Sequence, residues 1–312
     1  MTPSDHLNFP VKKPVGTKTT DWIPISVPAA LILYFSQPWK VMEFSHFLLL
    51  AFNASFVFFL LWWSDRYERE KFSTILWALG WGAFPACLFS ILFESFAFTT
   101  VSGSFIEEIF KLAGLLIVFR RGSINSWMDG LIIGGFIGLG FAVIEDVLYA
   151  ISDSNIFETI FYRGLFSIFA HTFFSGVGAV IMVFGLLSRR VWLTIIGFMI
   201  SFTLHLLWNT ILDFGIDPTY STNSFIFFAI VPPVVVIILA IFLRINEKNE
   251  LKKRGIIAVS KNLVSQQDLN LILVMRHRRD HIRQLPNRRE KREFKNKIYA
   301  MARKILTEGF DS

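Results

Sequence analysis

Long apolar runs separated by short polar segments account for most of the chain. A helix that crosses a membrane needs about 20 mostly apolar residues, and seven runs meet this requirement. They cover residues 44–64, 72–93, 104–120, 128–150, 158–187, 191–213 and 223–243. A shorter run at 22–36 contains Pro24 and Pro28, and it is either an eighth span or a helix at the membrane interface. The pattern predicts an all-α fold: a polytopic transmembrane helix bundle of about eight spans, or seven if the first helix is interfacial.

The amino-acid composition agrees with this pattern. Of the 312 residues, 53% are hydrophobic, 16% are aromatic and 18% are charged, whereas soluble proteins average about 25% charged residues. These fractions exclude a disordered chain and a collagen-like chain. The single cysteine, Cys87, excludes an intramolecular disulfide and a zinc site built from cysteines.

Basic residues occur in every second connection between the predicted spans. These connections contain Lys12, Lys13, Lys18, Arg66, Arg69, Lys71, Arg120, Arg121, Arg189 and Arg190, and the basic C-terminal region follows the last span. The connections near 94–103, 151–157 and 214–222 contain no Lys or Arg, and the one near 37–43 contains only Lys40. Because basic loops stay on the cytoplasmic side, we predict a multi-pass protein of the cell membrane with both termini in the cytoplasm.

The positive charge is concentrated at the C-terminus. Residues 244–312 contain 18 Lys and Arg against 8 Asp and Glu, a net charge of +10, whereas residues 1–243 carry −3. Apolar residues recur there at helical spacing, at Phe294, Ile298, Met301 and Ile305. This pattern predicts a basic surface helix that anionic lipid attracts. No stacking or groove-reading motif accompanies the charge, which disfavours nucleic acid as a partner.

These features divide the chain into three parts. Residues 1–21 form a polar cytoplasmic N-terminus, which does not have the pattern of a cleavable signal peptide. Residues 22–243 form the transmembrane domain, and residues 244–312 form the basic cytoplasmic tail.

Ionisable residues inside the predicted spans are costly to bury, so they mark candidate functional sites. Four successive helices carry the polar residues Glu107, Glu108, Lys111, Glu145, Arg163, His171, His205 and Asn209. The predicted topology places Glu107, Glu108 and Glu145 near the outer ends of their helices. His205 and Asn209 then fall in the outer half of theirs, and His171 lies deeper. We therefore predict one polar cavity in the outer half of the bilayer.

Helical spacing suggests how these residues are arranged. Glu107 and Lys111 are four residues apart, so they can pair on one face, which leaves Glu108 free for another role. His205 and Asn209 also share a face. The run Gly130, Gly134 and Gly138 favours close packing of the fifth span against a neighbouring helix.

Simpler explanations exist for each residue taken alone. A Glu107–Lys111 pair could be purely structural, and a lone histidine on an apolar face is more often a hydrogen-bonded core residue than a catalyst. Arg163 near a span boundary could extend its charge to the interface. The polar cluster as a whole also fits an ion- or proton-coupled transporter, and the basic tail fits a membrane scaffold. No internal repeat supports the transporter, and the cluster is confined to four consecutive spans.

Five short motifs occur in order along successive helices. They are Asp65-Arg66-Tyr67-Glu68, Glu107-Glu108-x-x-Lys111, Gly138-x-Gly140-Phe141-x-x-x-Glu145, Arg163 with His171, and His205-x-x-Trp208-Asn209. This ordered set resembles the PrsW family of intramembrane proteases over roughly residues 44–215. The set is also similar to the wider group of CAAX-processing and bacteriocin-processing membrane proteases. Because the third motif ends in Glu145 rather than His, the PrsW branch fits better.

The resemblance implies hydrolysis of a peptide bond in a single-pass membrane protein, similar to an anti-sigma factor, on its extracytoplasmic side. It gives no role to the basic tail. We predict a metal-free mechanism without a cofactor, in which Glu107 or Glu108 is the general base for a water molecule. His205 and Asn209 would then stabilise the oxyanion, and His171 and Glu145 would orient water or protonate the leaving amine.

The alternative to this mechanism is a zinc site. Its ligands would be drawn from Glu108, Glu145, His171 and His205, because imidazoles and carboxylates suit zinc. The spans contain no HExxH motif, which disfavours a site of the zincin type without excluding zinc.

Overall fold

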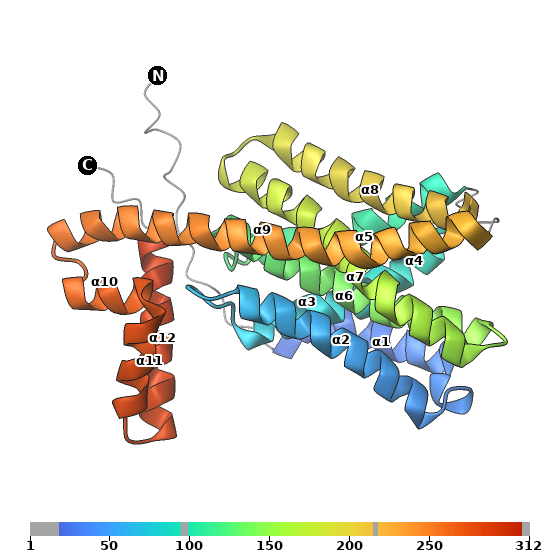
Figure 1. The fold of residues 1–312 in the computed structure, drawn as a ribbon, viewed down its shortest axis with the longest axis horizontal. Helices are drawn as coiled ribbons and strands as arrows, with labels where there is room; N and C mark the ends of the chain where they lie inside the picture. The colour runs from blue at the N-terminus through green and yellow to red at the C-terminus, as the bar shows by residue number, and fades with distance from the viewer. Residues whose placement is uncertain (1–18, 95–98, 215–217, 308–312) are drawn as a thin grey trace.

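A computed structural model describes residues 19–94, 99–214 and 218–307, and within these residues every regular element is a helix (Figure 1). The α-helices are α1 (Ile23–Ser36), α2 (Phe44–Ser64), α3 (Phe72–Trp81), α4 (Cys87–Glu94), α5 (Thr100–Arg120), α6 (Trp127–Ser152), α7 (Ile156–Leu187), α8 (Val191–Phe214), α9 (Pro218–Ser260), α10 (Gln266–Leu273), α11 (Met275–Gln284) and α12 (Arg288–Thr307). The predicted all-α bundle is confirmed.

Six helical segments of the described chain are long and apolar enough to cross a membrane. They begin with Phe44–Ser64 and Phe72–Glu94 and continue with Trp127–Ser152, Ile156–Leu187, Val191–Ile211 and Ile230–Ser260. Two predicted spans are not among them. Helix α1 has only 14 residues, and α5 carries Glu107, Glu108 and Lys111 within its apolar stretch. The protein is therefore a multi-pass membrane protein in which α5 brings charge into the bundle.

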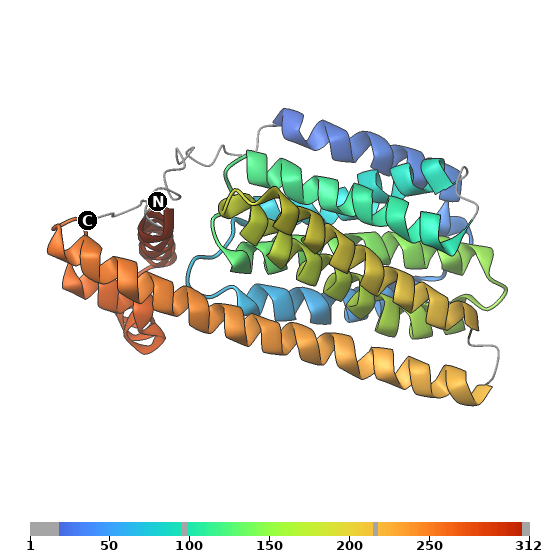
Figure 2. The same cartoon turned by 90° about the horizontal axis from the view of Figure 1, so that it is seen from above.

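Helix α6 lies at the centre of the bundle. Its most extensive interface is with α7, and it also packs against α2, α3 and α5. Most of its residues are buried, whereas α2 and α8 are largely exposed on the bundle surface. Seen from above, α1 and α9 lie on opposite sides of the bundle (Figure 2). A side chain on the inner face of α6 is therefore shielded from lipid on several sides.

Glycines allow α6 and α7 to approach closely. A Cβ atom at Gly134 would lie 2.3 Å from the Cβ of Ala179, and one at Gly138 would lie 2.2 Å from the carbonyl oxygen of His171. Both distances are too short for any larger residue without a backbone shift. The predicted packing role of this glycine run is confirmed.

Helix α9 carries the tail away from the bundle. It has 43 residues, which corresponds to about 65 Å at the usual rise per residue, and its C-terminal part projects beyond the other long helices (Figure 1). The predicted start of the tail at residue 244 therefore lies inside a continuous helix rather than at a break. This rigid connection holds the tail at one end of the bundle.

The tail forms a small core of its own. The apolar positions of α12 lie on one face, as predicted. Two of them, Ile298 and Ile305, are fully buried against Leu251, Leu269 and Ile272. The apolar face of α12 therefore packs on protein and not on lipid. The basic face remains available for the predicted attraction to anionic lipid.

The tail is joined to the transmembrane domain by Arg303. Its guanidinium pairs with Glu68, lies 2.8 Å from Oε1 of Glu70, and donates to the carbonyl oxygen of Ser123 at 3.3 Å. Tyr67 from the same α2–α3 connection joins the apolar core of the tail. Removing one partner of a buried ion pair leaves an uncompensated charge, so this contact should be sensitive to substitution.

Burial changes the protonation of the acidic connection between α2 and α3. Desolvation raises the pKa of Asp65 to about 7, although its Oδ2 accepts a hydrogen bond from the backbone N–H of Glu70. Desolvation likewise raises the pKa values of Glu68 and Glu70, and the charge of Arg303 opposes this effect. The folded protein therefore retains protons here that an unfolded chain would lose.

We expect Arg303→Gln to destabilise the docked tail by about 3 kcal/mol, because Glu68 and Glu70 lose their cation while they stay buried. The measurement is the thermal unfolding midpoint of purified protein, together with the rate at which a protease cuts the tail. Arg289→Gln is the matched control, since Arg289 on the same helix pairs with Glu293 in solvent and such pairs contribute about 0.5 kcal/mol. Equal effects of the two substitutions would contradict the docking role of Arg303.

We also expect stability to fall as the pH rises from about 4 to about 7. Asp65 is still protonated in the folded state over this range but ionised in the unfolded state, so raising the pH favours unfolding. Asp65→Asn should reduce the slope of the unfolding midpoint against pH. A slope that is the same in the variant and the wild type would show that Asp65 does not contribute.

Candidate active site

Glu108 is the centre of a buried polar network. Its side chain is inaccessible to solvent, and Oε1 accepts hydrogen bonds from Nζ of Lys111 at 2.7 Å and from Nδ1 of His205 at 3.0 Å. Its Oε2 accepts a hydrogen bond from the hydroxyl of Ser201 at 2.5 Å. Both oxygens are thus used, and the contacts fix α5 to α8.

Lys111 extends the network to α7. Its Nζ lies 3.3 Å from Oε2 of Glu107 and 2.9 Å from Nδ1 of His171, and it is 4.0 Å from the centre of the Phe141 ring. The ammonium group is fully buried. One lysine therefore holds two carboxylates, an imidazole and an aromatic face in a fixed arrangement.

Glu145 is held from the other side. Its Oε2 lies 3.0 Å from Nε2 of His171 and accepts a hydrogen bond from Arg163 at 2.9 Å. Arg163 also donates to Oδ1 of Asp146 at 3.1 Å. Asp146 is fully buried beside Arg163. Helical periodicity places Asp146 on a different face from Glu145, but it does not show that α7 covers both faces.

His205 completes the network on α8. Its Nε2 faces Oε2 of Glu107 at 3.6 Å, and Nδ2 of Asn209 lies 3.3 Å from the same nitrogen. Asn209 also donates to the hydroxyl of Ser104 at 3.0 Å. The ring of His205 stacks on Phe174 and lies edge-on to His171. The structure thus brings all the predicted site residues together, and adds Ser104 and Ser201 as hydrogen-bonding partners.

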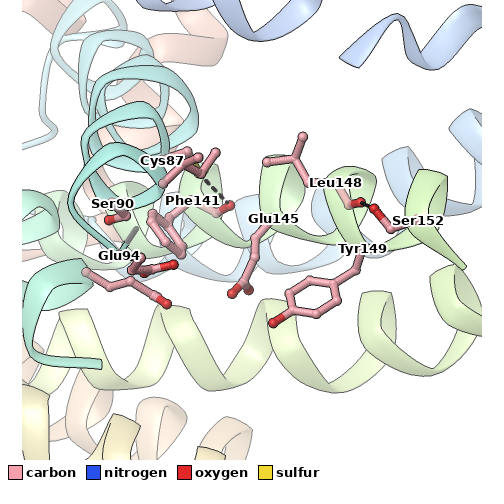
Figure 3. A pocket seen from close by; sticks show the side chains of 10 residues that line it. Cys87, Ser90, Glu94, Phe141, Glu145, Leu148, Tyr149 and Ser152 are labelled. Atoms are coloured by element: carbon pink, nitrogen blue, oxygen red, sulfur yellow. Dashed lines mark hydrogen bonds between the residues drawn. The ribbon is translucent and has the colours of Figure 1, made fainter. Parts of the chain in front are cut away.

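Only part of this network faces an open space. A cavity of about 300 Å³ is lined by Cys87, Ser90, Ile91, Glu94, Glu107, Phe141, Glu145, Leu148, Tyr149 and Ser152 (Figure 3). The carboxylates of Glu107 and Glu145 therefore reach it, whereas Glu108, His171 and His205 lie behind them. In Figure 3 the side chains of Glu94, Glu145 and Tyr149 extend from α4 and α6 into the same space.

Glu94 and Tyr149 were not predicted to belong to the site. Glu94 ends an apolar run, so it appears in the sequence as a helix terminus, and Tyr149 is one helical turn beyond Glu145. The guanidinium of Arg163 lies 3.7 Å from the centre of the Tyr149 ring. The four-residue spacing between Glu145 and Tyr149 was the available signal for the tyrosine.

The cavity lies toward the end of the bundle opposite the tail. Glu107 is in the second turn of α5, about 20 Å along the helix from Arg120. Glu145 is likewise in the last part of α6, far from the basic connection that precedes it. If basic loops are cytoplasmic, this position corresponds to the predicted outer half.

Three residues of the network could hold a metal ion. Glu107, His171 and His205 each offer one ligand atom, and the three atoms lie within 4.8 Å of one another. A carboxylate with two imidazoles is a donor set of hydrolytic zinc sites. In addition, Oε2 of Glu107 is buried and, apart from its ion pair with Lys111, makes no hydrogen bond to a described residue. Glu108 holds Nδ1 of His205, as a carboxylate commonly does behind a metal-bound histidine. The donor set therefore fits a zinc-like ion. Glu107 takes the place of Glu108 and Glu145 in the predicted ligand set.

Comparison with known proteins agrees with this geometry. The model of a family described as "PrsW family intramembrane metalloprotease" matches residues 70–241, which is more than half of the chain and includes the whole network. The chain belongs to the PrsW family. The predicted resemblance is therefore confirmed, and the tail beyond residue 241 lies outside the matched part.

A curated relative gives the same family. The chain is 29% identical to "Protease PrsW" of Bacillus subtilis (strain 168) over 118 residues, which is 34% of this chain and 53% of the relative. The match thus spans about half the length of this relative. A search of the solved structures gives no match.

We expect Gly138→Ala to disrupt the site as well as the fold. The added methyl group would meet the backbone of His171, so α6 and α7 would have to separate at the position where His171 contacts Lys111 and Glu145. A loss of stability of about 2 kcal/mol is typical of overpacking, and the peptidase activity that we propose below should fall with it. Unfolding midpoints and cleavage rates would be measured side by side.

The matched control is Gly103→Ala on α5. Among the described residues, no atom outside the local helix backbone lies within 4 Å of a Cβ atom at this position, so the substitution should leave stability unchanged or raise it slightly. A Gly138→Ala variant with wild-type stability and activity would contradict the close packing of α6 on α7.

Proposed function

We propose that this PrsW-family protein is an intramembrane endopeptidase that cleaves a membrane-anchored protein. One observation carries the proposal: the carboxylates of Glu107 and Glu145 line a single cavity, and a buried lysine and two imidazoles hold them there. This arrangement provides groups that can activate water and transfer protons in a site shielded from lipid.

The position of the cavity favours one class of substrate. Because the cavity is remote from the basic connections, the positive-inside rule favours the outer half of the membrane for it. A single-pass protein whose scissile bond lies near the outer surface would reach it, as an anti-sigma factor would. Ile91, Phe141 and Leu148 on the cavity wall favour apolar residues beside that bond.

The family description and the donor set favour a metal over a metal-free site. Glu107, His171 and His205 would hold the ion. Such an ion, when bound, polarises a carbonyl oxygen and makes bound water acidic enough to be deprotonated near neutral pH.

Glu145 is then the remaining carboxylate for proton transfer. Both of its contacts, to His171 and to Arg163, involve Oε2, so the carboxylate is oriented while part of it stays accessible to the cavity. It can take a proton from the attacking water and return it to the nitrogen of the leaving amine. Arg163 keeps Glu145 in place through its second contact, to Asp146.

The remaining polar groups position rather than react. Glu108 orients His205 and neutralises Lys111. Asn209 contacts His205 but does not line the cavity. The hydroxyl of Ser90 does line it and makes no hydrogen bond to a described residue, so it is available to donate to the carbonyl oxygen of the substrate.

The test is cleavage of a panel of single-pass membrane proteins by purified protein, with and without a strong chelator. Glu145→Gln should lower the rate by about a thousandfold, as expected for loss of the group that takes the proton from the reacting water. Glu107→Gln should also lower the rate, because it removes a carboxylate ligand of the ion. Glu158→Gln on α7 is the control, because Glu158 is exposed in the first turn of its helix. Chelator should abolish cleavage, and added zinc should restore it.

Other outcomes would overturn parts of this proposal. Cleavage that survives the chelator but not Glu107→Gln would favour the metal-free mechanism in which Glu107 is the general base. The transporter predicts ion flux in vesicles without a cut product, and the scaffold predicts tolerance of Glu107→Gln together with sensitivity to loss of the tail.

A further inference from the structure

A second and larger cavity lies at the opposite end of the bundle. Its volume is about 650 Å³, which is in the range of small-molecule sites. It lies between the ends of α5 and α7, the start of α6, the extended part of α9 and the end of α12. Nothing in the proposed protease mechanism uses it.

Two buried side chains of the cavity wall have oxygen atoms to which no described residue donates a hydrogen bond. Glu247 on α9 is buried, with 5% of its surface exposed, and neither carboxylate oxygen has a hydrogen-bond partner among the described residues. Oδ1 of Asn125 is also buried and unpaired within the same part of the chain. The Asn125 amide is oriented by a hydrogen bond from Nδ2 to Glu68 at 2.9 Å, so its oxygen is an acceptor. Acceptors alone favour a ligand with several N–H donors.

The charge around Glu247 also favours a cation. Asp65, Glu68 and Asp129 act on Glu247 electrostatically, and so does the opposite charge of Arg244, which donates to the backbone carbonyl oxygens of Trp63 and Ser64. Arg303 is already engaged by Glu68 and Glu70. An ammonium group beside Glu247 would stabilise the ionised carboxylate and donate to its unpaired oxygens.

Other parts of the wall suit the rest of an amphiphile. Arg120 and Lys253 are exposed residues that line the cavity and carry positive charge, which suits a phosphate. Phe184, Leu187 and Leu243 provide apolar surface on helices that continue into the membrane, which suits an acyl chain. A polar end and an apolar wall thus meet where the spans end.

We propose that this cavity binds an ethanolamine phospholipid, with its ammonium group at Glu247 and Asn125 and its phosphate toward Arg120 and Lys253. An ethanolamine head group has three N–H donors, whereas a choline head group has the same charge and no N–H donor. The lipid would fill the space between α9 and the bundle, where the tail begins to project.

The first test uses the wild-type full-length protein. Native mass spectrometry in detergent would measure binding of phospholipids with identical acyl chains and with ethanolamine, N-methylethanolamine, N,N-dimethylethanolamine, choline or glycerol head groups. We expect affinity to fall with each methylation, with about a tenfold difference between the ethanolamine and choline lipids, because hydrogen bonds to a buried carboxylate are lost. Equal retention of the ethanolamine and choline lipids would overturn the proposal, and so would preferred retention of the anionic glycerol lipid.

The second test locates the selectivity. Glu247→Gln should make the ethanolamine and choline lipids bind equally, whereas Glu293→Gln, at an exposed position on α12, should keep the wild-type preference. Unchanged selectivity in a folded Glu247→Gln protein would overturn the assignment to this cavity. If this variant does not fold, the methylation series on the wild type still decides whether N–H donors are recognised.

A third arm distinguishes a lipid from a soluble amine. Phosphoethanolamine has the same head group without acyl chains, and it should displace the lipid only at a concentration at least about tenfold higher, because it loses the apolar contacts. Displacement at equal concentration would overturn the assignment to a phospholipid.

Discussion

The rest of the transmembrane site depends on the compensation of one buried charge cluster. An isolated ionised group in an apolar bundle would cost many kcal/mol, yet Glu108 and Lys111 are both fully buried on α5. They are tolerated because each meets partners from other helices: Ser201 and His205 on α8, and His171 on α7. These contacts require α5, α7 and α8 to keep one relative position. The same requirement fixes Glu107, the neighbour that faces the cavity.

Close packing of α6 on α7 makes the second half of the site. The glycines of α6 allow its backbone to touch that of α7 at His171, and this contact brings Glu145 within reach of His171 and Arg163. Small residues thus act here through geometry and not through chemistry. The glycines are on α6, and the partners of Glu145 are on α7. Their close packing holds the carboxylate of Glu145 at the same cavity as that of Glu107.

The two ends of the bundle differ in which polar groups are left unpaired. At the end that holds the proposed protease site, Glu108 and Lys111 have partners on three helices, while the hydroxyl of Ser90 on the cavity wall makes no hydrogen bond to a described residue. At the end that carries the tail, Arg303 pairs with Glu68 and Glu70, while Glu247 stays unpaired among the described residues. A fully engaged arginine cannot serve a further carboxylate. This difference in pairing is the physical reason for proposing a ligand at the second end and catalysis at the first.

The apolar runs of the sequence were enough to predict a helical membrane protein. Because ionisable residues are rare in long apolar helices, they also identified the candidate site, which comprises Glu107, Glu108, Glu145, His171, His205 and Asn209. The sequence also determined the family, since its motifs fall in order on successive helices. The packing of the helices was needed to show that Glu107 and not Glu108 faces the cavity, that Asp146 is buried, and that the apolar face of α12 packs on the tail itself. The physical reason is that helical periodicity shows which residues share a face of one helix, whereas their exposure and partners depend on which other helix packs against that face.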